Sequence, residues 1–241
     1  MIPILFVHGL IGHMRAPEIA AKFGDRALTP DLLGYGDNTA ASEEITLPEQ
    51  VEYLRWFLMD RGIERAHIAG HSIGGAIAIL FAKAYPDSAA SVISIEGNFT
   101  LKDAFWSKTL AEMPLEDVER SLQRDRSDLA GWLRASGVEP TPERLEAARS
   151  HLANQPASTI SAMAKSVVEI TASPEYLDGV MTVLNNGTRV HLIAGARSRD
   201  AWDVPAFVLD NADMTLVPDT GHLVTIESPQ AFADALATLI Q

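Results

Sequence analysis

Residues 70–74 read Gly-His-Ser-Ile-Gly, which matches the G-x-S-x-G pattern of a nucleophilic serine. The flanking residues fit that role, because the run HIAG predicts a strand and the run IGGAIAILFAKAY predicts a helix. The glycines allow a tight turn that holds Ser72 at the carboxyl edge of a sheet. In another setting Ser72 would be an ordinary turn residue or helix cap. The flanking elements therefore favour Ser72 as a catalytic nucleophile.

Two backbone N–H groups are expected to bind the negative oxygen that forms when such a serine attacks. One belongs to Ile73, at the start of the predicted helix, where the helix dipole favours negative charge. The other belongs to Leu10, in the His-Gly-Leu turn that ends the apolar run 2–7. His8 is expected to pack and hydrogen-bond in that turn, and Asp31 is likewise expected to be structural.

A nucleophilic serine needs a base, and His222 has the best context among the seven histidines. It follows a predicted strand, in the loop PDTGH, and precedes a predicted helix. A histidine in a loop at that end of a strand can reach a serine displayed at the same edge. The other histidines have weaker contexts: His67 and His191 lie in strand patterns, His71 is the variable residue of the serine motif, His151 lies in a helical segment, and His13 is expected in the pocket or on a surface loop.

The elements that must position these residues alternate along the chain. Short apolar runs predict strands at about residues 2–7, 26–30, 66–69, 91–95, 190–194 and 214–217. Helical patterns lie between several of them, one opened by the capping box Thr46-Leu-Pro-Glu49 and another opened by Ser228-Pro229. Alternating strands and helices imply parallel pairing with right-handed crossovers. We therefore predict a doubly wound, mostly parallel α/β sheet.

Residues 98–186 break this alternation, because they contain helical stretches separated by Pro and Gly but no strand pattern. Nearly ninety residues are too many for a single crossover helix. We expect residues 98–186 to form a helical cap and return helices, and residues 1–97 with 187–241 to form the core. A helical subdomain that only stabilises the fold is the alternative. Phe99, Phe105, Trp106 and Trp132 would give a cap an apolar pocket, although such residues can also form a core.

Together, His8-Gly9, Asp31-Leu-Leu-Gly-Tyr-Gly, Gly-His-Ser-Ile-Gly-Gly and Gly221-His222 resemble the motifs of the α/β-hydrolase fold superfamily in order and spacing. The resemblance covers the whole chain except the insertion, and it implies a Ser–His–acid esterase or a near relative. Members usually have two strands before the His-Gly strand, whereas this chain starts at that strand. A minimal six-stranded sheet is therefore expected.

The catalytic acid of the superfamily is usually found after the strand 190–194, where this chain has Ser198. Haloalkane dehalogenases in one branch carry a glutamate at the end of the strand that follows the nucleophile helix. Glu96 stands at that point, at the end of an apolar run where an unpartnered carboxylate is costly. We predict Glu96 as the acid and keep Asp200 as the alternative; Asp203, or no acid, is a third possibility. A Glu96 that faces solvent or anchors the cap would have no catalytic role.

The resemblance implies acyl transfer: Ser72 attacks a carbonyl carbon, His222 moves the proton, and Glu96 orients the imidazole. We expect hydrolysis of carboxylic esters with small or medium apolar acyl groups and no metal or organic cofactor. Dehalogenase and epoxide hydrolase chemistry is disfavoured, because those relatives use an aspartate where Ser72 stands. A thioesterase, lactonase or C–C bond hydrolase would use the same residues. A cofactor-free oxygenase or a slow-turnover small-molecule receptor of the same fold also remains open.

The net charge and the cysteine content limit the classes of partner and ligand that the protein can bind. A net charge of −13 disfavours nucleic acid and anionic membranes, which would repel the protein. The chain has no cysteine, which excludes disulfides and thiolate metal ligands. It begins without a basic segment, and its first apolar run is too short to span a bilayer. We expect a cytoplasmic protein that acts on a small molecule; the sequence does not indicate the oligomeric state.

Overall fold

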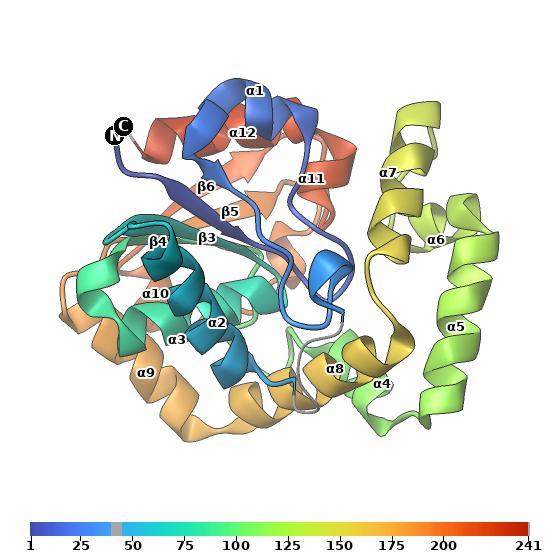
Figure 1. The fold of residues 1–241 in the computed structure, drawn as a ribbon, viewed down its shortest axis with the longest axis horizontal. Helices are drawn as coiled ribbons and strands as arrows, with labels where there is room; N and C mark the ends of the chain where they lie inside the picture. Colours follow the sequence, from blue (N-terminus) through green and yellow to red (C-terminus); the bar gives the residue numbers. More distant parts are fainter. Residues whose placement is uncertain (40–44, 241) are drawn as a thin grey trace.

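Six parallel strands form one sheet in the order β2-β1-β3-β4-β5-β6 (Figure 1). The computed structural model of the protein describes residues 1–39 and 45–240. The strands are β1 (Ile4–Val7), β2 (Ala27–Leu28), β3 (Ala66–His71), β4 (Ala89–Ile95), β5 (Val190–Gly195) and β6 (Asp213–Val217). The predicted doubly wound sheet of six strands is confirmed, and it is parallel throughout.

The strand bounds differ from the sequence prediction in ways that have physical causes. β2 has two residues rather than five, because residues Gly24–Arg26 form a 3-10 turn and Pro30 has no N–H to donate to a ladder. β3 extends to His71 and β5 to Gly195, both beyond the expected ends. As a result, β3 leads directly into Ser72.

Helices cover both faces of the sheet. On one face lie α1 (Pro17–Phe23), α11 (Val224–Glu227) and α12 (Pro229–Leu239), and on the other α2 (Leu47–Asp60), α3 (Ile73–Ala84), α9 (Pro174–Asn185) and α10 (Ala206–Leu209) (Figure 1). The side chains of β1 alternate between the two layers, with Ile4 and Phe6 in one core cluster and Leu5 and Val7 in the other. The strand is buried on both faces, as its continuous apolar run predicts.

The capping box at the start of α2 is confirmed. Thr46 Oγ1 accepts a hydrogen bond from the Glu49 N–H at 3.3 Å, and the Glu49 carboxylate accepts one from the Thr46 N–H at 3.2 Å. The helix buries one apolar face, which includes Leu47, Val51, Leu54 and Leu58. This packing fixes α2 against α3, the helix that follows Ser72.

The segment between β4 and β5 is helical, as expected. Its helices are α4 (Phe105–Glu112), α5 (Leu115–Ser127), α6 (Leu129–Ala135), α7 (Pro142–Ala153), α8 (Ala157–Ala172) and α9. In Figure 1, α5, α6 and α7 stand beside the sheet, whereas α8 and α9 run back along the layer of α2 and α3. Prolines mark these boundaries: Pro142 and Pro174 lie in the first turns of α7 and α9, while Pro114 and Pro156 precede α5 and α8. No helix in the described part of the chain is long and apolar enough to cross a membrane.

The strand order places a crevice at one edge of the sheet. β1 pairs with β2 on one side and with β3 on the other, so successive strands are added in opposite directions from β1. In open α/β sheets, ligands bind outside the carboxyl ends of the strands at such a switch point. β1 leads into Leu10 and β3 leads into Ser72, and both residues line a cavity there.

Candidate active site

Ser72 occupies a strained turn between β3 and α3. Its backbone has φ 55° and ψ −122°, a conformation that residues other than glycine rarely adopt. The Ser72 N–H donates to the Ile95 carbonyl at 3.0 Å, which ties the turn to the end of β4. A Cβ on Gly70 would lie 2.0 Å from the Gly74 carbonyl oxygen, so the turn needs glycine there. The tight turn predicted from the sequence, a nucleophile elbow, is present, and Ser72 lines the cavity.

The two predicted oxyanion donors lie next to this turn. Ile73 is the first residue of α3, so its N–H has no acceptor within the helix. Leu10 lies in the turn after β1, and its carbonyl accepts a hydrogen bond from the Tyr35 hydroxyl at 3.1 Å, which anchors that turn. Leu10 and Ser72 line the same cavity. The role of the two N–H groups stays a prediction.

Glu96 directly follows β4 and is 5% exposed. Its Oε2 atom lies 2.8 Å from Nδ1 of His222, whereas its Oε1 atom accepts the Gly195 N–H at 2.7 Å and the Ser198 hydroxyl. Burial raises the pKa of Glu96, but the hydrogen bond and charge of His222, with the donors Ser198 and Gly195, hold that pKa below its ordinary value. The carboxylate is therefore ionised and has a partner at both oxygens. The backbone of Glu96 has φ 44°, which is a second strained position at the site.

The other predicted acids lie elsewhere. Asp200 is exposed in the 3-10 turn Arg199–Ala201. Asp203 accepts hydrogen bonds from Thr100 Oγ1 at 2.8 Å and Lys102 Nζ at 3.1 Å. Among the described residues, Glu96 is the carboxylate that contacts His222.

His71 has a role that the sequence did not reveal. Its Nε2 atom lies 2.8 Å from the carbonyl oxygen of His222, and the two rings are 4.7 Å apart. Burial, with the neighbouring His222 imidazole, lowers the pKa of His71 to about 3. The neutral ring donates from Nε2 to this carbonyl and so holds the backbone of His222. Position 71 is the variable residue of the G-x-S-x-G motif, so the motif does not predict this contact. The contact joins two loops that are distant in the sequence.

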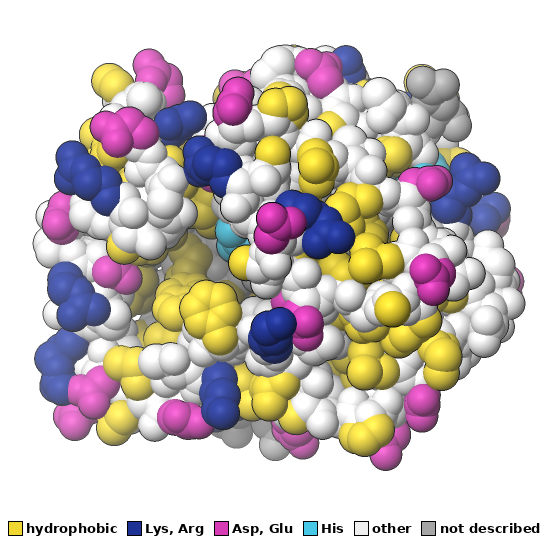
Figure 2. Space-filling model, turned by 180° about the vertical axis from the view of Figure 1, so that it is seen from behind, with side chains coloured by type: hydrophobic (Ala, Val, Ile, Leu, Met, Phe, Trp, Pro, Cys, Tyr) yellow, Lys and Arg dark blue, Asp and Glu magenta, His cyan; other side chains and the backbone are white. Residues whose placement is uncertain are grey.

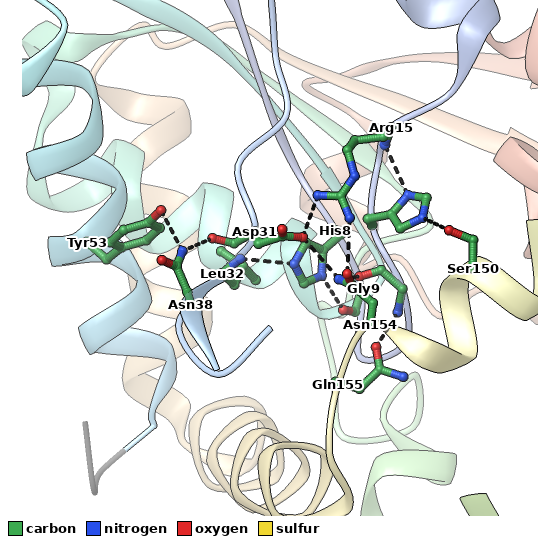
Figure 3. A network of polar contacts seen from close by, with 12 residues as sticks. His8, Gly9, Arg15, Asp31, Leu32, Asn38, Tyr53, Ser150, Asn154 and Gln155 are labelled. Atoms are coloured by element: carbon green, nitrogen blue, oxygen red, sulfur yellow. Dashed lines mark hydrogen bonds and ion pairs between the residues drawn. The ribbon is translucent and has the colours of Figure 1, made fainter. Parts of the chain in front are cut away.

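His8 and Asp31 lie in a network of hydrogen bonds beside the turn after β1, which agrees with the structural roles expected of them (Figure 3). His8 Nε2 accepts the Leu32 N–H at 3.1 Å, and burial lowers the pKa of His8 to about 4. Asp31 contacts Arg15 at 2.7 Å and Asn154 at 3.0 Å. Although burial raises the pKa of Asp31, these hydrogen bonds hold it below its ordinary value. Asn154 also donates to the Gly12 carbonyl at 2.9 Å, so the network joins the loop after β1 to the chain that follows α7.

His13 lies neither in the cavity nor on the surface, so both expectations for it are wrong. It is 8% exposed, its Nε2 lies 2.7 Å from Ser150 Oγ, and its ring lies 4.4 Å from that of His151 on α7. Long-range packing of α7 on this loop buries it, which the sequence alone does not reveal. His67 and His191 lie on strands, as expected, and neither ring nitrogen of the buried His191 has a hydrogen-bond partner among the described residues.

The cavity that holds these groups has a volume of about 820 Å³. Ser72, His222, Glu96 and Leu10 lie in its wall together with four aromatic side chains: Phe105, Trp106, Trp132 and Trp202. Figure 2 shows a hollow on this face, with hydrophobic side chains gathered at its edge. Three of the four aromatic residues suggested by the sequence line the cavity, whereas Phe99 is buried in the core. Trp202 was missed because it follows β5, far from the insertion.

The fold, the strained serine and the Glu96–His222 pair define an α/β hydrolase. The chain belongs to the alpha/beta hydrolase family, whose sequence model matches residues 4–235. The assignment to the α/β-hydrolase superfamily is thereby confirmed.

Individual relatives are distant. An uncharacterized protein of Mycobacterium tuberculosis is 29% identical over 124 residues, which is 50% of this chain and 36% of that protein. Lipase 3 of Moraxella is 29% identical over 109 residues, covering 44% of this chain and 33% of the lipase. The chain thus matches about a third of the length of these curated relatives.

Solved structures agree on the fold. A thermophilic esterase from Thermogutta terrifontis superposes with a TM-score of 0.72 at 20% identity, covering 100% of this chain and 89% of that chain. MenH from S. aureus gives a TM-score of 0.73 at 16% identity, with 99% and 93% covered. At such identities the likeness shows the fold alone, so the substrate must be argued from the site.

Proposed function

We propose that this protein is a serine hydrolase that cleaves carboxylic esters through an acyl-enzyme intermediate. The observation that carries the proposal is the 2.8 Å contact between Glu96 Oε2 and His222 Nδ1, in the wall of the cavity that Ser72 enters. A carboxylate on Nδ1 leaves Nε2 without its proton, and Nε2 is then the nitrogen that can accept a proton from a serine hydroxyl. We therefore assign Glu96 as the acid, His222 as the base and Ser72 as the nucleophile of a catalytic triad.

In this mechanism Ser72 attacks the carbonyl carbon while His222 takes its proton. The backbone N–H groups of Ile73 and Leu10 bind the oxygen as negative charge develops. His222 then delivers the proton to the leaving alcohol, and water attacks the acyl-enzyme by the same route. Glu96 stays ionised and stabilises the imidazolium, consistent with its lowered pKa. None of these steps needs a metal or an organic cofactor.

The cavity favours esters with small or medium apolar acyl groups. Its volume of about 820 Å³ lies within the usual range for small-molecule sites, and four aromatic side chains lie in its wall beside charged residues such as Lys102, Arg124 and Asp125. Phe105 of α4, Trp106 of α4 and Trp132 of α6 come from the helical segment 98–186. We infer that this segment is a cap, in which α4 to α6 enclose the substrate.

The test is a panel of aryl esters of increasing acyl length, with thioesters and lactones, on the wild type and Ser72→Ala. We expect ester hydrolysis that is unchanged by a chelator, and a loss of about 10⁶-fold in kcat in Ser72→Ala. A fluorophosphonate should label Ser72 with one equivalent. Labelling of another residue, or full activity of Ser72→Ala, would contradict the proposal, whereas preference for a thioester or lactone would change only the substrate class.

A further inference from the structure

Arg197 and Glu227 meet beside the loop Asp219–Gly221 that leads to His222. We propose that this ion pair is a positioning device, which holds His222 in register with Glu96 and joins the histidine loop to the cap. The proposal rests on the proposed function, in which His222 is the base. Neither residue belongs to a motif of the sequence, and neither lines the cavity.

Glu227 closes α11, and its side chain is 2% exposed. A carboxylate at such a depth is costly unless its oxygens have partners. Oε1 accepts the Gly221 N–H at 2.7 Å, and Oε2 accepts a hydrogen bond from the Arg197 guanidinium. The buried charge is therefore directed at the residue immediately before His222.

Arg197 forms hydrogen bonds to Asp219 and Thr220, the two residues before Gly221. Its Nη1 donates to the Asp219 carbonyl at 3.0 Å, and its backbone N–H donates to the Thr220 carbonyl at 2.9 Å. Asp219 has φ 55°, a strained conformation that persists only when its surroundings fix it. With Glu227 on Gly221, every residue of the loop 219–221 is bonded to this pair.

The same short segment holds both ends of the His222–Glu96 contact. Gly195 and Ser198 donate to Glu96, while Arg197 between them donates to the histidine loop. A shift of Arg197 therefore moves the base relative to its acid. Misplacement of a catalytic group by about 1 Å can cost on the order of 10²-fold in rate.

Arg197 also reaches the helical segment. Its Nη2 donates to the Gly137 carbonyl at 3.0 Å, in the turn between α6 and α7. Trp132 of α6 lines the cavity, so one guanidinium connects a cavity wall to the loop of the base. Removal of the Arg197 side chain should therefore increase the mobility of the cavity wall at α6 and of the loop 219–221.

The test compares Arg197→Met, Arg197→Lys and Glu227→Gln with Arg144→Met. Arg144 is a matched control because it ties α7 to the Glu227 main-chain carbonyl at 2.8 Å without contacting the loop 219–221. We expect kcat to fall about 10- to 100-fold in Arg197→Met and Glu227→Gln with KM changed less than about threefold. Arg197→Lys should recover part of the loss, and Arg144→Met should stay within about threefold. Thermal melting shows whether each variant is folded at the temperature of the kinetic assay.

A second measurement does not depend on turnover. In the wild type, the proton between His222 Nδ1 and Glu96 should give a downfield NMR signal, assigned by its loss in Glu96→Gln. The signal should weaken or move in Arg197→Met and stay in place in Arg144→Met. Lower melting temperature with unchanged kcat and an unchanged signal would overturn the proposal, as would equal damage in Arg144→Met. If the wild type hydrolyses no ester but the signal responds as expected, the proposed function fails and the positioning role stands.

Discussion

The hydroxyl of Ser198 donates a hydrogen bond to Glu96. Ser198 stands where related enzymes usually keep the catalytic acid, and Glu96 lies on the neighbouring strand end. The two positions are adjacent because β4 and β5 pair in parallel, which brings both carboxyl ends to one edge. A carboxylate at either strand end can thus reach the same histidine, and in this protein the serine that follows β5 donates to the carboxylate that follows β4.

Replacing the charge of Glu96 while keeping its shape tests the assignment of the acid. Glu96→Gln presents an amide to His222 Nδ1, which favours the wrong tautomer and leaves the imidazolium unsupported. We expect kcat to fall by on the order of 10³–10⁴-fold, or about 4–5 kcal/mol of barrier. Asp200→Asn is the matched control in an exposed turn and should stay within about threefold. A crippled Asp200→Asn beside an active Glu96→Gln would reverse the assignment.

Ser198→Ala removes one donor from the Glu96 carboxylate. Because Ser198 helps to lower the pKa of Glu96, its removal should raise that pKa. We expect a fall of roughly 3- to 10-fold in kcat and an earlier loss of activity as the pH is lowered. Rate profiles between pH 4 and 8 provide the measurement. Ser198→Thr keeps the hydroxyl and should retain the wild-type profile; a Ser198→Ala profile that coincides with the wild type would show that the hydrogen bond has no functional weight.

Trp106 should contribute to the choice of acyl group. It is 42% exposed and lines the cavity, so Trp106→Ala removes apolar surface that a longer acyl chain would cover. We expect KM to rise about tenfold for the longer chains of an ester series and to change little for acetate esters. Trp56→Ala is the matched control, since Trp56 is 57% exposed on α2 and lies outside the cavity wall. Equal effects of the two substitutions would remove Trp106 from the binding surface.

Buried histidines should make the stability depend on pH. Burial lowers the pKa of His8 and of His13 to about 4, so the unfolded chain binds protons that the folded chain does not. The free energy of unfolding should therefore fall as the pH drops from about 6.5 to about 4, by on the order of 3 kcal/mol for His8. Urea titrations at pH 7.5, 5.5 and 4.5 measure this slope.

His13→Gln is the control for that slope. Glutamine can keep a hydrogen bond to Ser150 but cannot take up a proton, so the stability of this variant should depend less on pH. Depressed carboxylates such as Asp31 act in the same direction, but only at lower pH, as they are protonated. A stability that is flat between pH 7.5 and 4.5 would contradict the prediction.

The sequence by itself determined the parts of this protein that depend on local chemistry. The apolar runs buried on both faces, the capping box at Thr46 and the glycines around Ser72 each specify their own backbone, and so they predict the sheet and the elbow. Glu96 is the acid that the resemblance to haloalkane dehalogenases predicts, and the cost of an unpartnered carboxylate at the end of an apolar strand supports that prediction. The sequence leaves Asp200 open as an alternative, since no local pattern shows which of two strand ends faces His222.

The tertiary structure decided the contacts between segments that lie far apart in the sequence. Glu96 meets His222 across 126 positions, and His71 reaches the His222 carbonyl across 151. Arg197 and Glu227 show no motif, because their roles are to bond main-chain groups, and any sequence supplies a main-chain carbonyl or N–H. The burial of His13 likewise depends on a distant segment, and the two-residue length of β2 is not predicted by its apolar run. Local propensity sets which elements form, and long-range packing sets which side chains meet at their ends.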